Sequence, residues 1–341
     1  MGSWRSMPMS IAIRRRRRML PWPARPSWPR NRQSCCRPLP RRSAWTRPAR
    51  EPRRKSPGRR SAFGCGSRVD PARRIESGLE AAFAALPPTE VVRAARYATL
   101  GGGHRWRGGM AVAAGSMYRT DADECALPLA VGLEMMQAAS LVLDDLPSMD
   151  NALTRRGKAC VHLVFPEWVV ALLPAYLVNL AYAVAAGNEQ APEGCRIRAL
   201  RLLGEMGGRM AHGQELDLAL ARPPVNEAAL LECYALKSGS LFAAALAGGA
   251  LLCGAGEADA AELREAGIRL GQAYQILDDL ADGPEEDSAY QDAGRITAYS
   301  LFGPVAARAR AEQLLSEVSR RLDRFGPAAG RLRDLLGQIR T

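Results

Sequence analysis

The sequence predicts an all-α protein with one large helical domain behind a basic N-terminal tail. From Arg68 onward nearly every segment is rich in Ala, Leu, Arg and Glu, and its apolar positions recur three and four residues apart, which is the spacing of an amphipathic helix. The alternation of apolar and polar residues that indicates strands is hard to find. This part has neither a long linker nor a repeat, so we expect a single domain over 67–341.

The first 66 residues differ from the rest in charge and composition. Residues 1–62 hold 18 Arg and one Lys but a single acid, Glu51. Although the whole chain has a net charge of +12, the rest of it contains 28 basic and 34 acidic residues and is therefore acidic. Ten of the 23 prolines also fall here, and prolines interrupt any helix or strand. We expect 1–66 to be a disordered tail that buries no core.

Three origins of this tail stay open. The favoured one is translation from upstream of the true start codon in a GC-rich gene, so that the tail is not part of the native protein. The second is a plastid transit peptide, because the stretch is rich in Arg and Ser and almost free of acids. The third is a basic arm that binds anionic partners. We expect a cytoplasmic protein that binds no nucleic acid, or a plastid protein if the tail is a transit peptide.

Breaks rich in Pro and Gly divide the helical pattern. They lie at 86–88, 101–103, 147, 191–194, 222–224 and 283–284. The expected helices are 70–86, 89–100, 108–118, 122–146, 167–187, 195–221, 226–235, 238–254, 257–282, 303–325 and 328–340. The longest apolar run, 241–256, is shorter than the roughly 20 residues that cross a bilayer. We therefore expect a core helix there and no transmembrane segment.

Two aspartate clusters interrupt apolar helices. The first reads LVLDDLPSMD over 141–150, and the second reads QILDDLAD over 275–282. Carboxylates grouped on apolar helices need a counter-cation, because burial and mutual repulsion would otherwise protonate or expose them. Hard oxygen ligands of this kind select Mg²⁺. The predicted magnesium ligands are Asp144, Asp145, Asp150, Asp278, Asp279 and Asp282.

Basic residues accompany these clusters. Arg105, Arg107, Arg155, Arg156 and Lys237 lie beside glycines or at helix starts, where guanidinium and ammonium groups can hold phosphate oxygens. The plainer alternative is that each aspartate group only caps or solvates a helix end. Two clusters on apolar helices, together with the arginine pair, favour a magnesium and phosphate site.

Five short motifs follow one another along the chain. They are GGGHRWR (101–107), DDLPSMD with RRG (144–157), GQELDL (213–218), KSGSLF (237–242) and GQAYQILDDLAD (271–282). In this order they resemble the motifs GGKRxRP, DDxxxxD with RRG, GQxxDL, KTGxLF and GxxFQxxDDxxD of the trans-isoprenyl diphosphate synthases. This is the polyprenyl synthetase family, and the resemblance is strongest to its short-chain geranylgeranyl diphosphate synthases. Each motif alone is weak, but the ordered set is specific.

The resemblance implies a bundle of helices around a central cavity, the isoprenoid synthase type I fold, and a homodimer. It further implies that about three Mg²⁺ ions grip an allylic diphosphate, whose carbon–oxygen bond breaks while metal and cationic groups stabilise the leaving diphosphate. Isopentenyl diphosphate then attacks the allylic cation. The catalytic residues implied by the resemblance are Asp144, Asp145, Arg155, Lys237, Gln275 and Asp278.

The resemblance also implies a set of substrate-binding residues. They are His104, Arg105, Arg107, Gln137, Arg156, Ser238 and Arg295. His104 replaces the family's loop lysine, Gln137 replaces a histidine, and Arg295 stands where a lysine is usual. Protonated His can bind phosphate and the Gln amide can donate a hydrogen bond, so we expect weaker binding of isopentenyl diphosphate rather than lost activity.

One helix predicts the product length. In the family, a bulky residue four or five positions before the first aspartate stops chain growth, but Ser140 and Ala139 are small here. One turn deeper, Met135 and Met136 can form a floor. This favours a C20 product, geranylgeranyl diphosphate, over farnesyl diphosphate or a product of C25 or longer. Alternatively, Ala139 and Ser140 only pack against a neighbouring helix, and another helix supplies the floor.

The leading hypothesis is therefore a Mg²⁺-dependent prenyltransferase, and two others stay open. A lyase or cyclase on the same scaffold would ionise an allylic diphosphate without using isopentenyl diphosphate. His104 and Gln137 favour it, whereas Arg105, Arg107 and Arg156 argue against it. The other is a non-catalytic partner subunit, against which the two intact aspartate clusters argue.

Overall fold

The structure, a computed structural model, describes residues 70–219, 226–292 and 296–339, and for 284–292 the backbone alone. The predicted tail, the break at 222–224 and Arg295 lie outside these residues. Helices make up nearly all of the regular structure in the described part, so the all-α prediction is confirmed.

The elements of the described residues follow one another along a single unit of the chain. Their order is α1 (Pro71–Ala84), α2 (Glu90–Thr99), α3 (Trp106–Gly115), α4 (Ala122–Cys125), α5 (Leu127–Asp144), β1 (Thr154–Arg155), β2 (Lys158–Ala159), α6 (Val161–Val164), α7 (Glu167–Ala186), α8 (Glu193–Ala219), α9 (Glu227–Lys237), α10 (Gly239–Leu252), α11 (Glu257–Asp292), α12 (Ala298–Phe302), α13 (Pro304–Asp323), the 3-10 helix η1 (Gly326–Ala329) and α14 (Gly330–Ile339).

Short polar side chains begin several of the helices just after the expected breaks. The side chains of Asp70, Thr89 and Asn226 accept hydrogen bonds from backbone N–H groups two or three residues later, at the starts of α1, α2 and α9. Such caps satisfy donors that the first turn of a helix leaves without a partner. The break predicted at 283–284 is also present, because Gly283 interrupts α11 with a φ of 76°.

Three parts of the prediction were wrong in detail. The helix expected over 122–146 is divided into α4 and α5, because Pro128 stands in the first turn of α5, where its missing N–H is not needed. Strands β1 and β2 form an antiparallel hairpin, and strands of two residues are too short to leave an alternating pattern. The short helix α12, which is started by a capping box at Thr297, was also not predicted.

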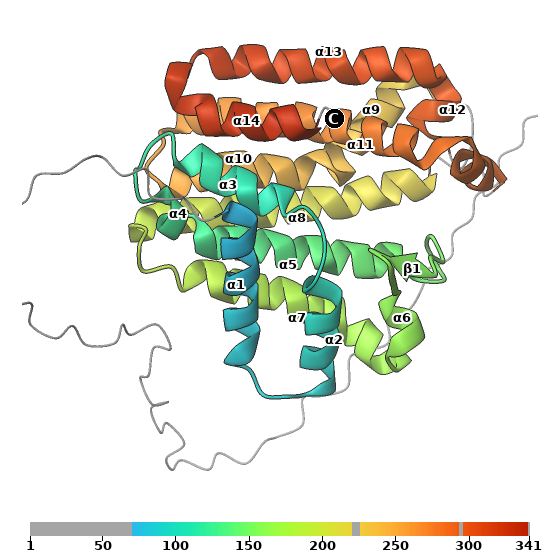
Figure 1. Ribbon diagram of the computed structural model, residues 1–341, viewed down its shortest axis with the longest axis horizontal. Helices are drawn as coiled ribbons and strands as arrows, with labels where there is room; N and C mark the ends of the chain where they lie inside the picture. Colours follow the sequence, from blue (N-terminus) through green and yellow to red (C-terminus); the bar gives the residue numbers. More distant parts are fainter. Residues whose placement is uncertain (1–69, 220–225, 293–295, 340–341) are drawn as a thin grey trace, which may run out of the picture. The chain divides into compact units, whose positions relative to one another are not determined.

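Helix α10 is the centre of the core. All of its residues are buried, as expected for a helix that is apolar on every side. It packs against α3, α5, α8, α9 and α11, and Figure 1 shows it between α11 and α8. Its glycines allow close approach, since a Cβ on Gly249 would lie 2.1 Å from the carbonyl oxygen of Ala111 on α3.

The segments that carry the predicted site residues lie toward one end of the bundle. Helix α5 ends at Asp144, the hairpin follows it, and α12 follows the interrupted end of α11. In Figure 1 all three are at the right of the view, whereas α1 and α2 run across the direction of α5 and α7. The packing of α5 and α11 around α10 therefore fixes where both aspartate clusters lie.

Two described helices, α5 and α7, are long and apolar enough to cross a membrane by length and composition alone, and the bent pair of α9 and α10 passes the same test as one broken span. The run 241–256 that was expected to be a core helix forms the buried helix α10. Helix α5 is 61% buried within the bundle, but α7 is only 33% buried. The apolar character of α5 thus serves the core, whereas α7 leaves an apolar face exposed.

The close contact of α10 with α3 predicts a difference between two glycines. Gly249→Ala should lower the free energy of unfolding by about 1–3 kcal/mol, because the added methyl collides with the backbone of α3. Gly208→Ala on α8 is the matched control, since nothing lies within 4 Å of its Cβ position, and it should raise stability by about 0.5–1 kcal/mol. Urea unfolding curves measure both. Equal stabilisation by the two variants would contradict this packing.

Candidate active site

Both aspartate clusters line one cavity of about 1080 Å³. Its walls come from α3, α5, the hairpin, α7, α8, α9 and α11. The carboxylates that line it are Glu134, Asp144, Asp150, Glu215, Asp217, Asp278, Asp279 and Asp282, and the basic residues are His104, Arg105, Arg107, Arg155, Arg156 and Lys237. Apolar residues such as Met136, Val178 and Met210 also line it, so the cavity combines a charged region with an apolar one.

Asp144 and Asp150 lie close together, although four residues separate the Asp144–Asp145 pair from Asp150 in the sequence. The chain turns back after α5, and the N–H of Asp150 donates a hydrogen bond to the carbonyl of Asp144 over 2.9 Å. Burial raises the pKa of Asp144 to about 6; the nearby charge of Lys237 opposes this, and those of Asp150 and Asp217 add to it. Burial and the neighbouring carboxylates thus both disfavour the charged form of Asp144.

Asp145 is placed differently from its neighbour. Its carboxylate is 3% exposed and accepts hydrogen bonds from Nε and Nη2 of Arg155, at 3.0 Å and 2.6 Å. Asp145 does not line the cavity, whereas Arg155 does. The structure thus separates the predicted pair, with Asp144 turned to the cavity and Asp145 fixing the guanidinium of Arg155.

The second cluster also has exposed and buried members, although all three of its aspartates line the cavity. Asp278 and Asp282 lie one turn apart on α11, are exposed and line the cavity. Asp279 is 8% exposed and accepts hydrogen bonds from the hydroxyl of Tyr234 and from the N–H of Ala298. Burial raises the pKa of Asp279 although these hydrogen bonds oppose the shift. Asp279 therefore joins α9 and α11 to the start of α12.

A chain of hydrogen bonds connects Asp279 to the junction of α9 and α10. Gln275 donates from Nε2 to Oδ1 of Asp279 over 3.1 Å, and Oε1 of Gln275 accepts a hydrogen bond from the hydroxyl of Ser238 over 2.6 Å. The predicted residues Gln275 and Ser238 are thus brought together and hold each other in place. Sequence reasoning missed Tyr234, because a tyrosine on an apolar helix is usually read as core.

Lys237 is a cation whose charge acts on Asp144 of the first cluster. Its Nζ lies 2.6 Å from Oδ2 of Asp217, at the end of the GQxxDL motif on α8. Burial lowers the pKa of Lys237, but the carboxylates of Asp217, Asp144 and Asp150 outweigh this effect and raise it. Lys237 stays protonated and faces the region where the aspartates of α5 meet the cavity.

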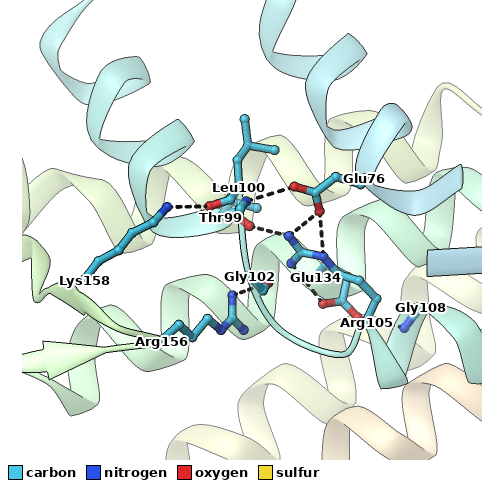
Figure 2. Close-up of polar contacts among 10 residues, drawn as sticks. Glu76, Thr99, Leu100, Gly102, Arg105, Gly108, Glu134, Arg156 and Lys158 are labelled. Carbon is cyan, nitrogen blue, oxygen red and sulfur yellow. Dashed lines mark hydrogen bonds and ion pairs between the residues drawn. The ribbon is translucent and has the colours of Figure 1, made fainter. Parts of the chain in front are cut away.

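The basic residues at the start of α3 and in the loop before it differ in exposure and in their contacts. His104 is exposed and stacks on Trp106, with ring centres 5.6 Å apart. Arg107 lines the cavity with its guanidinium 4.5 Å from the ring centre of Phe242, and burial lowers its pKa. Arg105, by contrast, is 4% exposed and its guanidinium is bound by carboxylates of the protein, as Figure 2 shows.

Two of the remaining predicted binding residues, Arg156 and Gln137, line the same cavity. Arg156, which follows β1, donates a hydrogen bond from Nη1 to the carbonyl of Gly102 over 3.0 Å, and it also lines the cavity. Gln137 lines the cavity from α5. Arg295 lies outside the described residues, so its position relative to these groups is a prediction only.

The apolar part of the cavity is shaped by three helices. Ala139, Ser140 and Met136 line it from α5, but Met135 does not, since it is fully buried in the core. Met136 lies close to α8, where a Cβ on Gly207 would be 3.0 Å from its methyl group. Helices α7 and α8 add further walls, with Pro174, Val178, Met210 and Ala211. The floor expected from α5 alone is thus shared with α7 and α8.

The donor set of the cavity fits Mg²⁺ bound together with a phosphorylated ligand. Among the residues that the structure describes, no three His, Cys, Asp or Glu side chains come close enough to hold an ion by themselves. Mg²⁺ usually keeps several waters and takes one or two carboxylates plus phosphate oxygens. Asp144 and Asp150 on one segment, with Asp278 and Asp282 on another, provide hard oxygen donors of this kind.

Comparison with known proteins identifies the family. Residues 88–323 match the polyprenyl synthetase family. This chain belongs to that family. It is therefore a prenyltransferase, as the order of its motifs predicted, and its helical bundle is the fold of the isoprenoid synthases.

Individual relatives differ in the product that their names give. A protein of Sinorhizobium fredii named "Probable farnesyl diphosphate synthase" is 34% identical over 283 residues, which are 78% of this chain and 84% of that protein. Geranylgeranyl pyrophosphate synthase 9, chloroplastic, of Arabidopsis thaliana is 33% identical over 274 residues, 75% of each chain. A crystal structure of the Helicobacter pylori geranyltransferase complexed with magnesium and isoprenyl diphosphate has a TM-score of 0.70 and 25% identity, covering 79% of this chain and 93% of that one.

The different placing of the two neighbouring aspartates predicts opposite effects on stability. Asp145→Asn should lower the free energy of unfolding by about 1–2 kcal/mol, because it leaves Arg155 without its charge partner at a half-exposed site. Asp144→Asn should leave it unchanged or raise it, because burial already disfavours the charge there. Urea unfolding at pH 7.5 in EDTA compares them. Equal losses in both variants would contradict the separate roles.

Proposed function

We propose that this protein condenses isopentenyl diphosphate with allylic diphosphates and releases geranylgeranyl diphosphate, the C20 product. The observation that carries the proposal is the cavity itself, in which carboxylates and basic side chains surround one region and small or flexible apolar side chains line the rest. A diphosphate suits the first region, and a growing prenyl chain suits the second. Family membership supports the reaction class.

Mg²⁺ is the proposed cofactor, held by Asp144, Asp150, Asp278 and Asp282 together with substrate oxygens, with three ions expected from the family. When bound, the metal supplies positive charge that neutralises the diphosphate as it leaves. Asp145 and Asp279, which were expected to be ligands, are instead proposed to hold the neighbouring groups in place, because protein donors bind Oδ1 of Asp145 and both carboxylate oxygens of Asp279.

The protein's own groups stabilise the charge that develops when the allylic carbon–oxygen bond breaks. Lys237, Arg155 and the Gln275 amide carry donors around the position of the leaving diphosphate. Their geometry is fixed beforehand, since Asp217 holds Lys237, Asp145 holds Arg155 and Asp279 holds Gln275. The apolar walls exclude water, which would otherwise capture the allylic cation.

Isopentenyl diphosphate is proposed to bind through Arg107 and Arg156, with His104 and Gln137 near its diphosphate. Its double bond attacks the allylic carbon, the new carbon–carbon bond forms, and the proton lost in the next step goes to the released diphosphate. His104 and Gln137 replace stronger ligands of the family, so the Michaelis constant for this substrate should be high.

Product analysis tests the proposed reaction. The full chain is incubated with Mg²⁺, isopentenyl diphosphate and dimethylallyl, geranyl or farnesyl diphosphate in turn, and products are identified by mass spectrometry. We expect a C20 diphosphate from each primer and no product in EDTA. Release of a hydrocarbon or alcohol without elongation would refute the proposal and favour the lyase or cyclase, for which the changes at His104 and Gln137 are the supporting observation.

Two neighbouring methionines test the origin of the chain length. Met136→Ala should give products longer than C20, because it removes a wall of the apolar part of the cavity. Met135→Ala is the matched control, since Met135 is fully buried and lies outside the cavity. It should cost about 2–5 kcal/mol of stability but leave the product at C20. Unchanged products from Met136→Ala would mean that α7 and α8 alone set the length.

We also propose that the protein is a homodimer joined through α7. Trp168 and Leu172 on this helix are 56% and 54% exposed, and Ala175, Ala183 and Ala186 continue the exposed face. Glu167 is the one charged residue of α7, and the exposed polar residue Asn179 donates its hydrogen bond to the carbonyl of Ala175 within the helix, so the face is mostly apolar. Large exposed apolar patches are rare on monomers, and the small alanines would let a second copy of α7 approach closely.

Substitution on this face predicts the oligomeric state. Leu172→Glu should convert the dimer into monomer, because a carboxylate would be buried at the contact. Val305→Glu is the control, since Val305 is 85% exposed on α13, away from α7, and it should leave the dimer intact. Sedimentation equilibrium measures both. A wild-type monomer, or dissociation of both variants alike, would contradict the proposed interface.

A cytoplasmic location is proposed for the described domain. The Arabidopsis relative is named as chloroplastic, so a plastid location would follow if residues 1–66 act as a transit peptide. That segment lies outside the residues the structure describes.

A further inference from the structure

Two carboxylates from other helices hold the loop that joins α2 to α3. Oε1 of Glu76, on α1, accepts a hydrogen bond from the N–H of Gly101 over 2.9 Å, and Oε2 accepts two from Arg105, at 2.9 Å and 2.5 Å. Glu134, on α5, accepts a hydrogen bond from the N–H of Gly108 over 2.9 Å and lies 3.5 Å from Arg105. Figure 2 shows both carboxylates beside the guanidinium of Arg105.

The backbone of this loop needs such support. Gly101 and Gly103 have φ values of 76° and 90°, and Arg105 has a φ of 54°. A residue with a side chain is disfavoured in this left-handed region. The guanidinium of Arg105 also donates a hydrogen bond to the carbonyl of Thr99 over 2.8 Å. The hydrogen bonds of this side chain thus offset the cost of the left-handed backbone at Arg105.

The loop in turn positions two arginines that face the cavity. The carbonyl of Gly102 accepts the hydrogen bond from Arg156, and a Cβ on Gly103 would lie 2.8 Å from the guanidinium carbon of Arg156. Arg107 stands in the first turn of α3, two residues after Arg105, which is the N-cap of that helix. A change in the shape of the loop would therefore move Arg107 and Arg156 together.

We propose that Glu76 and Arg105 are positioning residues, which act on isopentenyl diphosphate only through the arginines at 107 and 156. The proposal rests on the proposed function, in which these two arginines hold that diphosphate. Glu76 precedes residue 88, where the family match begins, so helix α1 contributes to the site from outside the matched segment. Arg105 is not a direct ligand, since its donors are engaged by Glu76, Glu134 and Thr99.

Glu76→Gln tests this, with Glu80→Gln as the matched control on the exposed face of α1. Glu76→Gln should raise the Michaelis constant for isopentenyl diphosphate about tenfold, the effect of one charged hydrogen bond. The Michaelis constant for the allylic substrate and the turnover number should change less than about twofold. Glu80→Gln should change none of them, and thermal unfolding checks that both variants fold.

Arg105→Lys separates positioning from direct binding. If Arg105 acts through Glu76, the two substitutions should not add. The double variant Glu76→Gln with Arg105→Lys should then have a Michaelis constant for isopentenyl diphosphate no higher than that of the more affected single variant. If Arg105 itself bound the diphosphate, releasing it from Glu76 would leave the Michaelis constant unchanged or lower it, and this result would overturn the proposal. Equal losses for both substrates would overturn it as well, because they would indicate a general loss of structure.

Failure of the proposed function can be distinguished from failure of the positioning role. If the proposed function is wrong, the wild-type chain will not elongate any primer. Calorimetric titration with isopentenyl diphosphate then replaces the kinetic readout, since binding does not require turnover. Weaker binding to Glu76→Gln than to Glu80→Gln supports the positioning role, and equal binding to the two variants refutes it.

Discussion

Carboxylates that line the same cavity repel one another, and burial in an apolar bundle strengthens that repulsion. This constraint explains much of the structure around the two aspartate clusters. Lys237 lies against Asp217, and its charge opposes the effect of burial, which raises the pKa of Asp144. The cavity is lined by more carboxylates than basic side chains, so bound cations would relieve the repulsion and would bring a diphosphate with them.

The same constraint explains why neighbouring aspartates differ in role. One member of each pair, Asp145 or Asp279, is buried and bound by protein donors, whereas Asp144 and Asp278 are more exposed and line the cavity. Asp279 reaches the cavity as well, but its carboxylate is bound by the protein. The buried members hold Arg155 on one side and join Tyr234 to α12 on the other. Each Asp-Asp pair thus provides one carboxylate for the ligand and one that fixes a neighbouring side chain, Arg155 or Gln275.

The sequence predicted the helices well because they depend on local pattern, and the aspartate clusters could be located for the same reason. Apolar spacing and Pro or Gly breaks fix helix limits, and the motifs are contiguous. It could not predict that Arg105 would turn to Glu76, because that contact joins residues 29 positions apart and depends on how α1 crosses α5. Glu134 could have been noticed in the sequence, since it is the one carboxylate in the middle of the apolar helix α5. In the structure it accepts the hydrogen bond from the N–H of Gly108.

Calorimetric titration with inorganic diphosphate measures whether the charged region of the cavity needs a metal to hold its ligand. We expect diphosphate to bind in Mg²⁺ but not in EDTA, and we expect Asp278→Asn to lose binding. Asp278 lines the cavity, so that variant removes a proposed metal ligand. Equal binding of diphosphate with and without Mg²⁺ would refute the proposed metal site, since the basic residues alone would then hold the ligand.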